Sequence, residues 1–343
     1  MKAGGTPKIE SVTPGAAIPG GEVVIRGSGF EPASGNGARP KVRFGDTDGA
    51  VLVGSENYLV ARVPEGASGG WVRVATPRAE SVPFPIALGV QIADNLHPVA
   101  NPAVDHDGNI YVTFSGQRGQ QVPVSLYKIT SNYTVKPLVT ELMNPTGLAL
   151  DRSGALFVSN RNDGTIHRVN TQDGRAEQWV EGMGVATGMA FDRENNLYVG
   201  DRSGTIFKIN PARQIFVFAT LEPSLAAYHL AFGPDGDLFV AGPTTSSYDR
   251  ILRINSHGEV ATYYRGLGRP QGLAFGRDGM LYAAASLHGQ RGIVRVTPDG
   301  KAEVVLSGIG VVGLALLPTR RAYLVTSGAL FSLDWDVEGM ALV

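Results

Sequence analysis

The clearest pattern of hydrophobic and polar positions lies at residues 144–169, where three short apolar runs alternate with polar turns. The runs occupy residues 147–150, 155–159 and 165–169. The first two are separated by Asp-Arg-Ser-Gly, in which the Asp side chain can accept backbone hydrogen bonds and the Gly can supply a positive φ. Three short strands joined by such turns predict an antiparallel meander.

This unit recurs along the chain. The residue that ends the first turn of each copy serves as a marker, and successive markers are 46, 42, 40, 43 and 41 residues apart. The markers are Gly108, Gly154, Asn196, Gly236, Gly279 and Arg320. A period of about 40 residues with about four strands per copy is typical of a β-propeller, in which neighbouring copies bury each other's sheet faces. The sequence therefore predicts an all-β protein with a six-bladed propeller.

The part of the chain before the repeats has a different pattern. Several short strands separated by Gly and Pro, at intervals of about ten residues, predict an immunoglobulin-like β-sandwich at residues 8–87. The expected strands lie at residues 9–14, 20–30, 41–45, 58–64 and 69–76. Residues 1–7 are a polar tail, and the propeller occupies residues 88–343. The two prolines within residues 83–89 predict a stiff hinge.

Closure of the propeller requires its two ends to meet in one blade, because an open sheet edge is a pairing hazard. We expect residues 89–95 to add an outer strand beside the last blade, residues 311–343. Residues 340–343 could compete for the same place.

The repeat resembles the NHL repeat. Residues 145–160 fit the pattern P-x-G-L-A-L-D-x-x-G-x-L-F-V-x-(N/D), and residues 186–201 approach it. The resemblance implies a propeller similar to the SMP-30/gluconolactonase-like superfamily. It does not imply one activity, since this architecture hosts scaffolds, lactonases and lyases.

The N-terminal part resembles an IPT/TIG domain. The matching pieces are P-x-I-x-S-V-x-P, G-G-x-V-x-I-x-G-x-G-F, V-x-F-G and V-P-x-G-x-x-G, at residues 7–14, 20–30, 42–45 and 63–69. Such modules usually flank surface or extracellular domains in bacteria, which favours an extracytoplasmic location. The module could bind a partner directly, or it could serve only as a spacer that packs on the propeller.

The start of the inner strand holds the sharpest candidate site. Four copies have glycine there, at Gly147, Gly188, Gly272 and Gly313. The first copy has Asn101 instead, and the fourth has His229, preceded by Tyr228. Copies one and four face each other across a six-fold ring, so we expect Asn101 and His229 to project into the channel, whose axis the glycines keep clear. Alternatively, these side chains only satisfy backbone groups or buried water.

The loops between second and third strands form a mildly basic rim on the same face. Their polar residues are Arg118, Asn160, Arg161, Asp201, Arg202, Asp249, Arg250, His288 and Arg291. The loops of copies one, four and five, residues 115–125, 242–249 and 286–291, are expected to be longer. We predict ligand contacts from Asn160, Arg161, Asp201, Arg202 and His288, because arginines recognise carboxylate or phosphate bidentately. The alternative is that the rim residues tie blade to blade.

Catalytic and metal-binding residues are not assigned. SMP-30-like lactonases hold a divalent ion in the channel, so the resemblance leaves a metal there as an option. The histidines that could share the face, His97, His229 and His288, follow no metal-ligand spacing. Propeller lyases use channel histidines with Arg or Tyr, and Tyr228, His229 and Arg202 could be arranged in that way.

Composition narrows the function classes. A net charge of −1 over 343 residues argues against nucleic acid as a partner. The chain has no cysteine, which excludes disulfides, a cysteine nucleophile and thiolate metal sites. No apolar run is long enough to span a bilayer, and the first residues do not resemble a signal peptide. The protein would then be cytoplasmic, or an export leader would precede this sequence.

Two functions remain. The first is a binding protein that holds a small molecule, glycan or protein at the channel mouth and carries an immunoglobulin-like accessory domain. The second is a hydrolase or lyase that acts on a small lactone, ester or carboxylated substrate.

Overall fold

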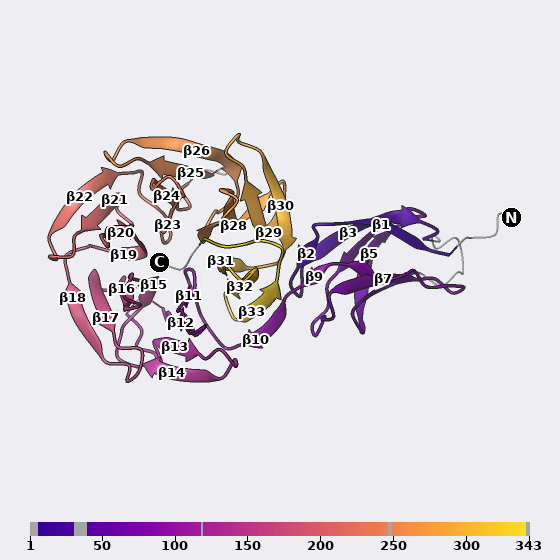
Figure 1. Ribbon diagram of the computed structural model, residues 1–343, viewed down its shortest axis with the longest axis horizontal. Helices are drawn as coiled ribbons and strands as arrows, with labels where there is room; N and C mark the ends of the chain where they lie inside the picture. Colours follow the sequence, from indigo (N-terminus) through magenta and orange to yellow (C-terminus); the bar gives the residue numbers. More distant parts are fainter. Residues whose placement is uncertain (1–5, 31–39, 118, 246–248, 341–343) are drawn as a thin grey trace.

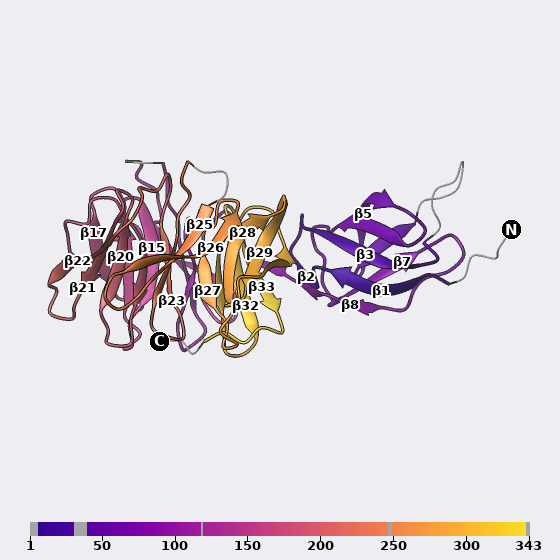
Figure 2. The same cartoon turned by 90° about the horizontal axis from the view of Figure 1, so that it is seen from above.

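The computed structural model describes residues 6–30, 40–117, 119–245 and 249–340. These residues form strands and no helix, in two domains that lie side by side (Figures 1 and 2). Accordingly, no helix in the described part could cross a membrane. Residues 1–5 of the predicted tail lie outside the described residues. The predicted all-β class is confirmed.

The N-terminal domain contains one seven-stranded sheet in the order β1-β3-β6-β5-β4-β7-β8. Its strands are β1 (Lys8–Thr13), β3 (Glu22–Ser28), β4 (Lys41–Phe44), β5 (Thr47–Gly54), β6 (Tyr58–Arg62), β7 (Trp71–Ala75) and β8 (Phe84–Pro85). The sequence analysis missed β5, because its side chains lie mostly in solvent and leave no alternating apolar signal.

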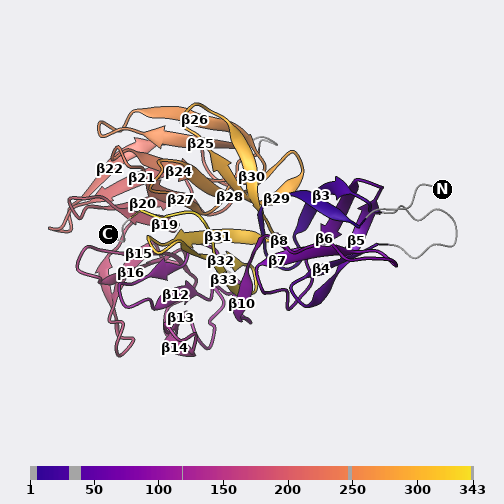
Figure 3. The same cartoon turned by 45° about the vertical axis from the view of Figure 1, so that its right-hand side comes forward.

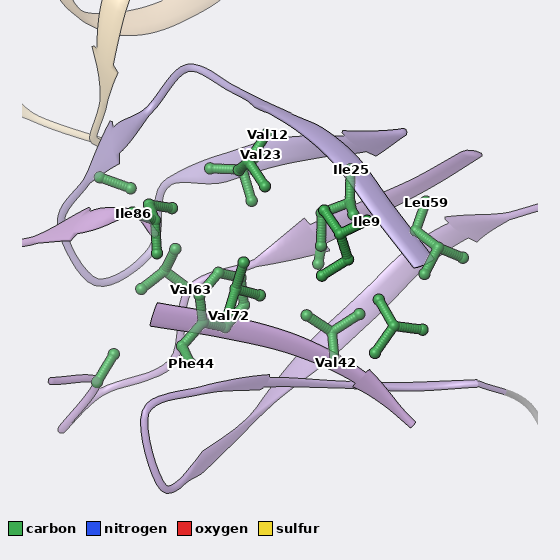
Figure 4. Packing of buried hydrophobic residues seen from close by; sticks show 14 of the residues in the cluster. Ile9, Val12, Val23, Ile25, Val42, Phe44, Leu59, Val63, Val72 and Ile86 are labelled. Atoms are coloured by element: carbon green, nitrogen blue, oxygen red, sulfur yellow. The ribbon is translucent and has the colours of Figure 1, made fainter. Parts of the chain in front are cut away.

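The sheet of the N-terminal domain folds over a hydrophobic core, and strands towards both ends of the sheet contribute side chains to this core (Figure 4). Val23 and Ile25 alternate with exposed or half-buried residues along β3, as expected for a strand with one buried face. Val42 and Phe44 of β4 and Val72 of β7 belong to the same buried cluster. This arrangement is the predicted sandwich.

The propeller consists of five four-stranded sheets and a sixth sheet that has six strands. From the axis outwards, the strands of the first two sheets are β11 (Ala103–Val104), β12 (Ile110–Thr113), β13 (Leu126–Ile129) and β14 (Val135–Val139), and then β15 (Pro145–Leu150), β16 (Leu156–Asn160), β17 (Thr165–Val169) and β18 (Ala176–Val180). The next two sheets contain β19 (Ala186–Phe191), β20 (Leu197–Asp201), β21 (Thr205–Ile209) and β22 (Ile215–Thr220), and then β23 (His229–Phe232), β24 (Leu238–Ala241), β25 (Asp249–Ile254) and β26 (Val260–Leu267). The blade strands of the last two sheets are β27 (Leu273–Phe275), β28 (Leu281–Leu287), β29 (Gln290–Val296) and β30 (Ala302–Ser307), and then β31 (Val311–Leu316), β32 (Arg321–Thr326), β33 (Leu330–Asp334) and β10 (Val90–Ala93). We call these sheets blades one to six in that order.

The turns between first and second strands follow the predicted chemistry. Asp151 Oδ1 accepts hydrogen bonds from the backbone N–H groups of Ser153 and Ala155, both at 2.9 Å. Gly154 has a φ of +80°. In the third blade the left-handed residue is Asn195, with a φ of +64°, and not the predicted marker Asn196. Asn tolerates this conformation better than most residues with a side chain.

The last blade closes as predicted. β10 pairs with β33, so a strand from before the first blade becomes the outer strand of the sixth (Figure 3). The C-terminal segment does not take this place in the described residues. Met340 N instead donates a hydrogen bond to Phe275 O, at 3.4 Å, in the fifth blade. Residues 341–343 lie outside the described part.

The two domains share one sheet. β2 (Ala16–Ala17) pairs in parallel with β30 of the propeller and with β9 (Ala87–Leu88) of the hinge. Ile18 N donates to Ser307 O at 3.0 Å, and the Ile18 side chain is buried among propeller residues. The fifth blade therefore continues into the N-terminal domain, with β2 hydrogen-bonded on both sides and the hinge strand β9 at the edge of the shared sheet.

Candidate functional site

The inner strands come into close contact at one level of the channel, which we call the neck. Its positions are Asn101, Gly147, Gly188, His229, Gly272 and Gly313. A Cβ atom added to Gly188 would lie 2.2 Å from Tyr228 O, and one added to Gly313 would lie 2.8 Å from Asn101 Cα. The glycines are needed because the backbone of the next inner strand fills the space of a side chain. This corrects the expectation that they serve to clear the channel axis.

Asn101 uses its side chain to join three blades. Its Nδ2 donates to Leu273 O at 2.8 Å, and its Oδ1 accepts from Leu314 N at 3.1 Å. The side chain thus reaches from the first blade to the fifth and sixth blades at the neck. One Nδ2 hydrogen and one Oδ1 lone pair are left over for a ligand.

His229 differs from Asn101, because its imidazole has no hydrogen-bond partner among the described residues. The residue is 3 % exposed. Burial lowers the pKa of His229 to about 4, so the ring is neutral at pH 7. A neutral imidazole has one donor and one acceptor nitrogen. His229 is therefore a buried polar group with unused hydrogen-bonding capacity.

Tyr228 is committed to the protein itself. Its hydroxyl donates to Glu222 O, and its backbone N–H donates to Thr187 Oγ1 at 3.1 Å. Burial raises the pKa of Tyr228 to about 12, so the phenol is neutral. In this arrangement Tyr228 positions the loop before His229 and does not offer a free proton.

The propeller has two faces, which we name from their connections. The loop face carries the loops between second and third strands, and the turn face carries the turns between first and second strands. On the loop face, Asp201 Oδ1 accepts from Val185 N at 2.9 Å, and Asp201 Oδ2 accepts from Ser203 Oγ. Asn160 Oδ1 accepts from Asn162 N at 3.1 Å. Both side chains are buried. Asn160 shapes its own loop, whereas Asp201 also ties its loop to the connection that precedes β19.

The two rim arginines reach neighbouring loops. Arg161 donates from a terminal guanidinium nitrogen to Gly116 O at 2.8 Å, which joins the second blade to the first. Arg202 donates to Leu225 O at 2.9 Å, which joins the third blade to the fourth. These bonds match the alternative that the rim ties blade to blade. Arg118 lies outside the described residues.

His288 lies apart from this group. The sequence analysis expected a longer loop at residues 286–291, but β28 and β29 continue to a two-residue turn, His288–Gly289. Both residues have positive φ, 50° and 82°, as a tight hairpin turn requires. The expected long loop is therefore wrong for the fifth blade. His288 is exposed at the tip of this hairpin.

Metal ligands are not grouped on either face within the described residues. No cluster of three or more His, Asp or Glu side chains lies close enough to hold an ion. His97 is exposed and packs against Phe114, with ring centroids 6.0 Å apart.

A cavity of about 520 Å³ lies on the turn-face side of the neck. Residues two positions beyond the neck point to the same side of each inner strand, and all of them are alanine. They are Ala103, Ala149, Ala190, Ala231, Ala274 and Ala315. Four of these alanines line the cavity: Ala103, Ala149, Ala190 and Ala274. The small alanine side chains at this level leave the channel wide, directly beside the level at which the neck closes it.

The rest of the cavity wall is largely apolar. It includes the aromatic residues Phe191, Phe232 and Phe275, and Asn101 lines it from the neck. Lys208 also lines it, with its ammonium 5.5 Å from the centroid of the Tyr198 ring. The sequence analysis placed the site on the other face and missed this wall. The signal that could have found it is the alanine that recurs at one position of the repeat.

The comparisons with known proteins support the two-domain fold. The IPT/TIG domain family matches residues 7–80. No curated protein matches the chain. An auxiliary nutrient binding protein from Bacteroides thetaiotaomicron is similar over 96% of this chain and 97% of its own, at 12% identity and a TM-score of 0.57.

Two solved enzymes share the architecture. A gluconolactonase from Xanthomonas campestris aligns over 72% of this chain and 89% of its own, at 15% identity and a TM-score of 0.58. A catalytically inactive virginiamycin B lyase from Staphylococcus aureus, solved with quinupristin, aligns over 97% and 96%, at 14% identity and a TM-score of 0.51. At these identities the likeness shows the fold alone. The N-terminal IPT/TIG domain and the β-propeller class predicted from the sequence are thereby confirmed.

Proposed function

We propose that this protein binds a small molecule in the propeller channel, with its site in the cavity between the neck and the turn face. The observation that carries the proposal is the alanine level, which opens a cavity of about 520 Å³ beside a closed neck. Ligand sites are usually concave, mostly apolar and equipped with a few polar groups. This cavity has an apolar wall, with Asn101 at one end and Lys208 at its side.

The loop face supports a catalytic role less well. Asp201, Arg202, Arg161 and Tyr228 all use polar atoms in hydrogen bonds to backbone groups of the protein itself. A general base or acid must reach a substrate proton, and groups engaged in this way are not poised for that. The proposed function is therefore that of a binding protein with NHL-like repeats, whose IPT/TIG domain serves as an accessory module. The resemblance to bacterial surface modules favours an extracytoplasmic location and a small-molecule, glycan or protein partner.

The test is to fill the cavity. Ala274→Leu places a larger side chain on the cavity wall, whereas Ala226→Leu makes the same change on the loop face, beside Tyr228. Anilinonaphthalene sulfonate serves as an apolar fluorescent probe, and native mass spectrometry detects a co-purified small molecule. We expect Ala274→Leu to lose probe binding and Ala226→Leu to keep it, with both variants folded by circular dichroism. Loss of binding in Ala226→Leu alone would move the site to the loop face and contradict the proposal.

A second candidate is a hydrolase or lyase, and one observation favours it. The neutral His229 ring has no partner in the described residues, so it could exchange a hydrogen bond with a substrate at the neck. Gluconolactone and quinupristin are suitable trial substrates, since solved proteins of this fold are a gluconolactonase and a virginiamycin B lyase. Turnover that disappears in His229→Leu but survives in Ala274→Leu would favour the enzyme. If neither compound is turned over, the binding function remains the favoured one.

A further inference from the structure

The outer strand of the third blade, β22, exposes an unusual amount of apolar surface. Its sequence is Ile-Phe-Val-Phe-Ala-Thr, and the exposed fractions of Ile215, Phe216 and Val217 are 41%, 51% and 66%. β22 is the last strand of its sheet and has no further pairing partner in the described part of the chain. Figure 1 shows it at the rim of the ring, on the side away from the N-terminal domain.

Most of the other outer strands carry the features by which proteins protect a sheet edge. β14 contains Lys136 and Pro137, β18 contains Glu177, and β26 contains Arg265. The fifth blade has its edge strand β30 covered by β2. β10 is interrupted by a register shift between Gln91 and Ala93.

β22 shares the register shift, which lies opposite Ile206 and Phe207, but it has none of the other protections. It contains no charged residue and no proline, and it is not covered by another strand. Apolar strands with free backbone groups pair readily with another strand. The difference between β22 and the other outer strands is therefore a specific feature of this blade.

We propose that β22 is the self-association edge of this protein, where a second copy of the chain adds its own β22 in antiparallel orientation about a two-fold axis. Such an axis makes one surface meet itself, so a neutral and apolar strand is self-complementary. Pairing would satisfy the free backbone groups of both strands and remove Phe216 and Val217 from water.

The residues beside β22 fit this orientation. In an antiparallel pair, the start of one strand lies next to the end of the other. Arg213 precedes β22 by two residues, and Glu222 follows it by two residues. Both are exposed, so Arg213 of each copy would lie near Glu222 of the second copy. Glu222 also contacts Arg250 of its own chain, at 3.2 Å. The opposite charges at the two ends favour the antiparallel pair.

The first experiment is sedimentation of the full chain over a wide range of concentration. We expect a reversible monomer–dimer equilibrium that Val217→Lys shifts to monomer. Val260→Lys is the control, because Val260 is an exposed valine on the outer strand of the next blade, where it pairs with Ile254 as Ile215 of β22 pairs with Ile209. It should leave the equilibrium unchanged. A wild-type chain that stays monomeric, or equal dissociation by both variants, would overturn the proposal.

The second experiment uses the absence of native cysteine. A single Val217→Cys lies near the proposed two-fold axis, where opposing strand residues come close enough to form a disulfide. Mild oxidation should give a covalent dimer for Val217→Cys and little for Val260→Cys. Equal cross-linking of the two variants would mean random collision. If β22 instead takes up a peptide from another protein, Val217→Cys will not cross-link to itself, which also rejects the proposal.

Discussion

The side chain of Asn101 occupies the space that a side chain on Gly272 would need. A Cβ atom added to Gly272 would lie 2.1 Å from Asn101 Oδ1 and 2.6 Å from Gly313 Cα. Asn101 lies in the first blade and Gly272 at the start of the inner strand of the fifth. The neck of the channel therefore depends on two residues that are 171 positions apart. The Asn101 side chain fits there only because residue 272 is a glycine.

Gly272→Ala should destabilise the propeller. Forcing a methyl group into a filled neck costs about 1–3 kcal/mol, or more where backbone cannot move. Urea unfolding measures the loss in free energy of unfolding. Gly328→Ala is the control, because a Cβ atom there would meet nothing within 4 Å, and it should change stability by less than about 0.5 kcal/mol. Equal effects of the two variants would contradict the close fit at the neck.

His229 should make stability depend on pH. Its pKa is about 4 in the folded protein and near 6.5 in an unfolded chain, so the unfolded state takes up a proton first. Above pH 6.5 the ring is neutral in both states, and the free energy of unfolding has its full value. This free energy falls as the pH drops towards 4, because the unfolded state takes up the proton more readily. The loss amounts to roughly 3 kcal/mol across that window.

His229→Leu removes this titration. The difference in unfolding free energy between wild type and variant should therefore narrow or reverse between pH 7 and pH 4.5, in favour of the variant. Gly328→Ala, which changes no titratable group, should run parallel to wild type. A difference between wild type and His229→Leu that stays constant with pH would show that His229 is not buried in its neutral form.

Ile18→Ala should weaken the junction between the domains. Ile18 is fully buried in a cluster with Tyr282, Ile293 and Leu306 of the propeller. Removing a buried Ile side chain down to Ala costs about 2–5 kcal/mol. Differential scanning calorimetry should show the domains unfolding more independently. Ile309→Ala, at an exposed position, is the control. An unchanged transition in Ile18→Ala would mean that the shared sheet does not couple the domains.

Asn144→Gly should release the long loop of the first blade. Asn144 is buried with a φ of +55°, and its side chain donates to Gly116 O and Gln117 O and accepts from Gly119 N. Gly keeps the left-handed backbone without strain but loses these bonds, at a cost of roughly 2 kcal/mol. Asn144→Ala should cost about 1 kcal/mol more, since it adds backbone strain. Hydrogen exchange should speed up at Gly119 in both variants, and unchanged exchange there would contradict this role.

Much of the fold could be predicted because its signals are local. Blades one to five repeat an Asp- or Gly-containing turn between short apolar runs, and the hydrogen bonds of Asp151 span only four residues. The outer strand β10 could also be predicted, because a ring must close. β5 could not, since its sequence, Thr-Asp-Gly-Ala-Val-Leu-Val-Gly, does not alternate apolar and polar residues. β2 and β9 could not either, since two residues give no period.

The candidate site followed the sequence only in part. Asn101 and His229 stand out as exceptions to the glycine of the repeat, and the structure places both at the neck. Their different environments could not be predicted, because Asn101 meets Leu273 O from 172 residues away. The rim arginines likewise find their partners on neighbouring blades. His288 was expected in a long loop. It lies instead in the tight turn between β28 and β29, because these two strands extend through the residues expected to form the loop.

The sequence by itself determined the class, the order of the strands and the turn chemistry, because these depend on residues close together in the chain. Only the tertiary structure decided where the channel closes, on which face it widens and how the two domains join. Those features arise where inner strands from different blades, or β2 and β30, meet across 40 residues, as Gly188 and Tyr228 do, or across 290, as Ala17 and Ser307 do. Packing of distant backbones sets where the channel closes and how the domains join, whereas the widening is marked in the sequence only by the recurring alanine.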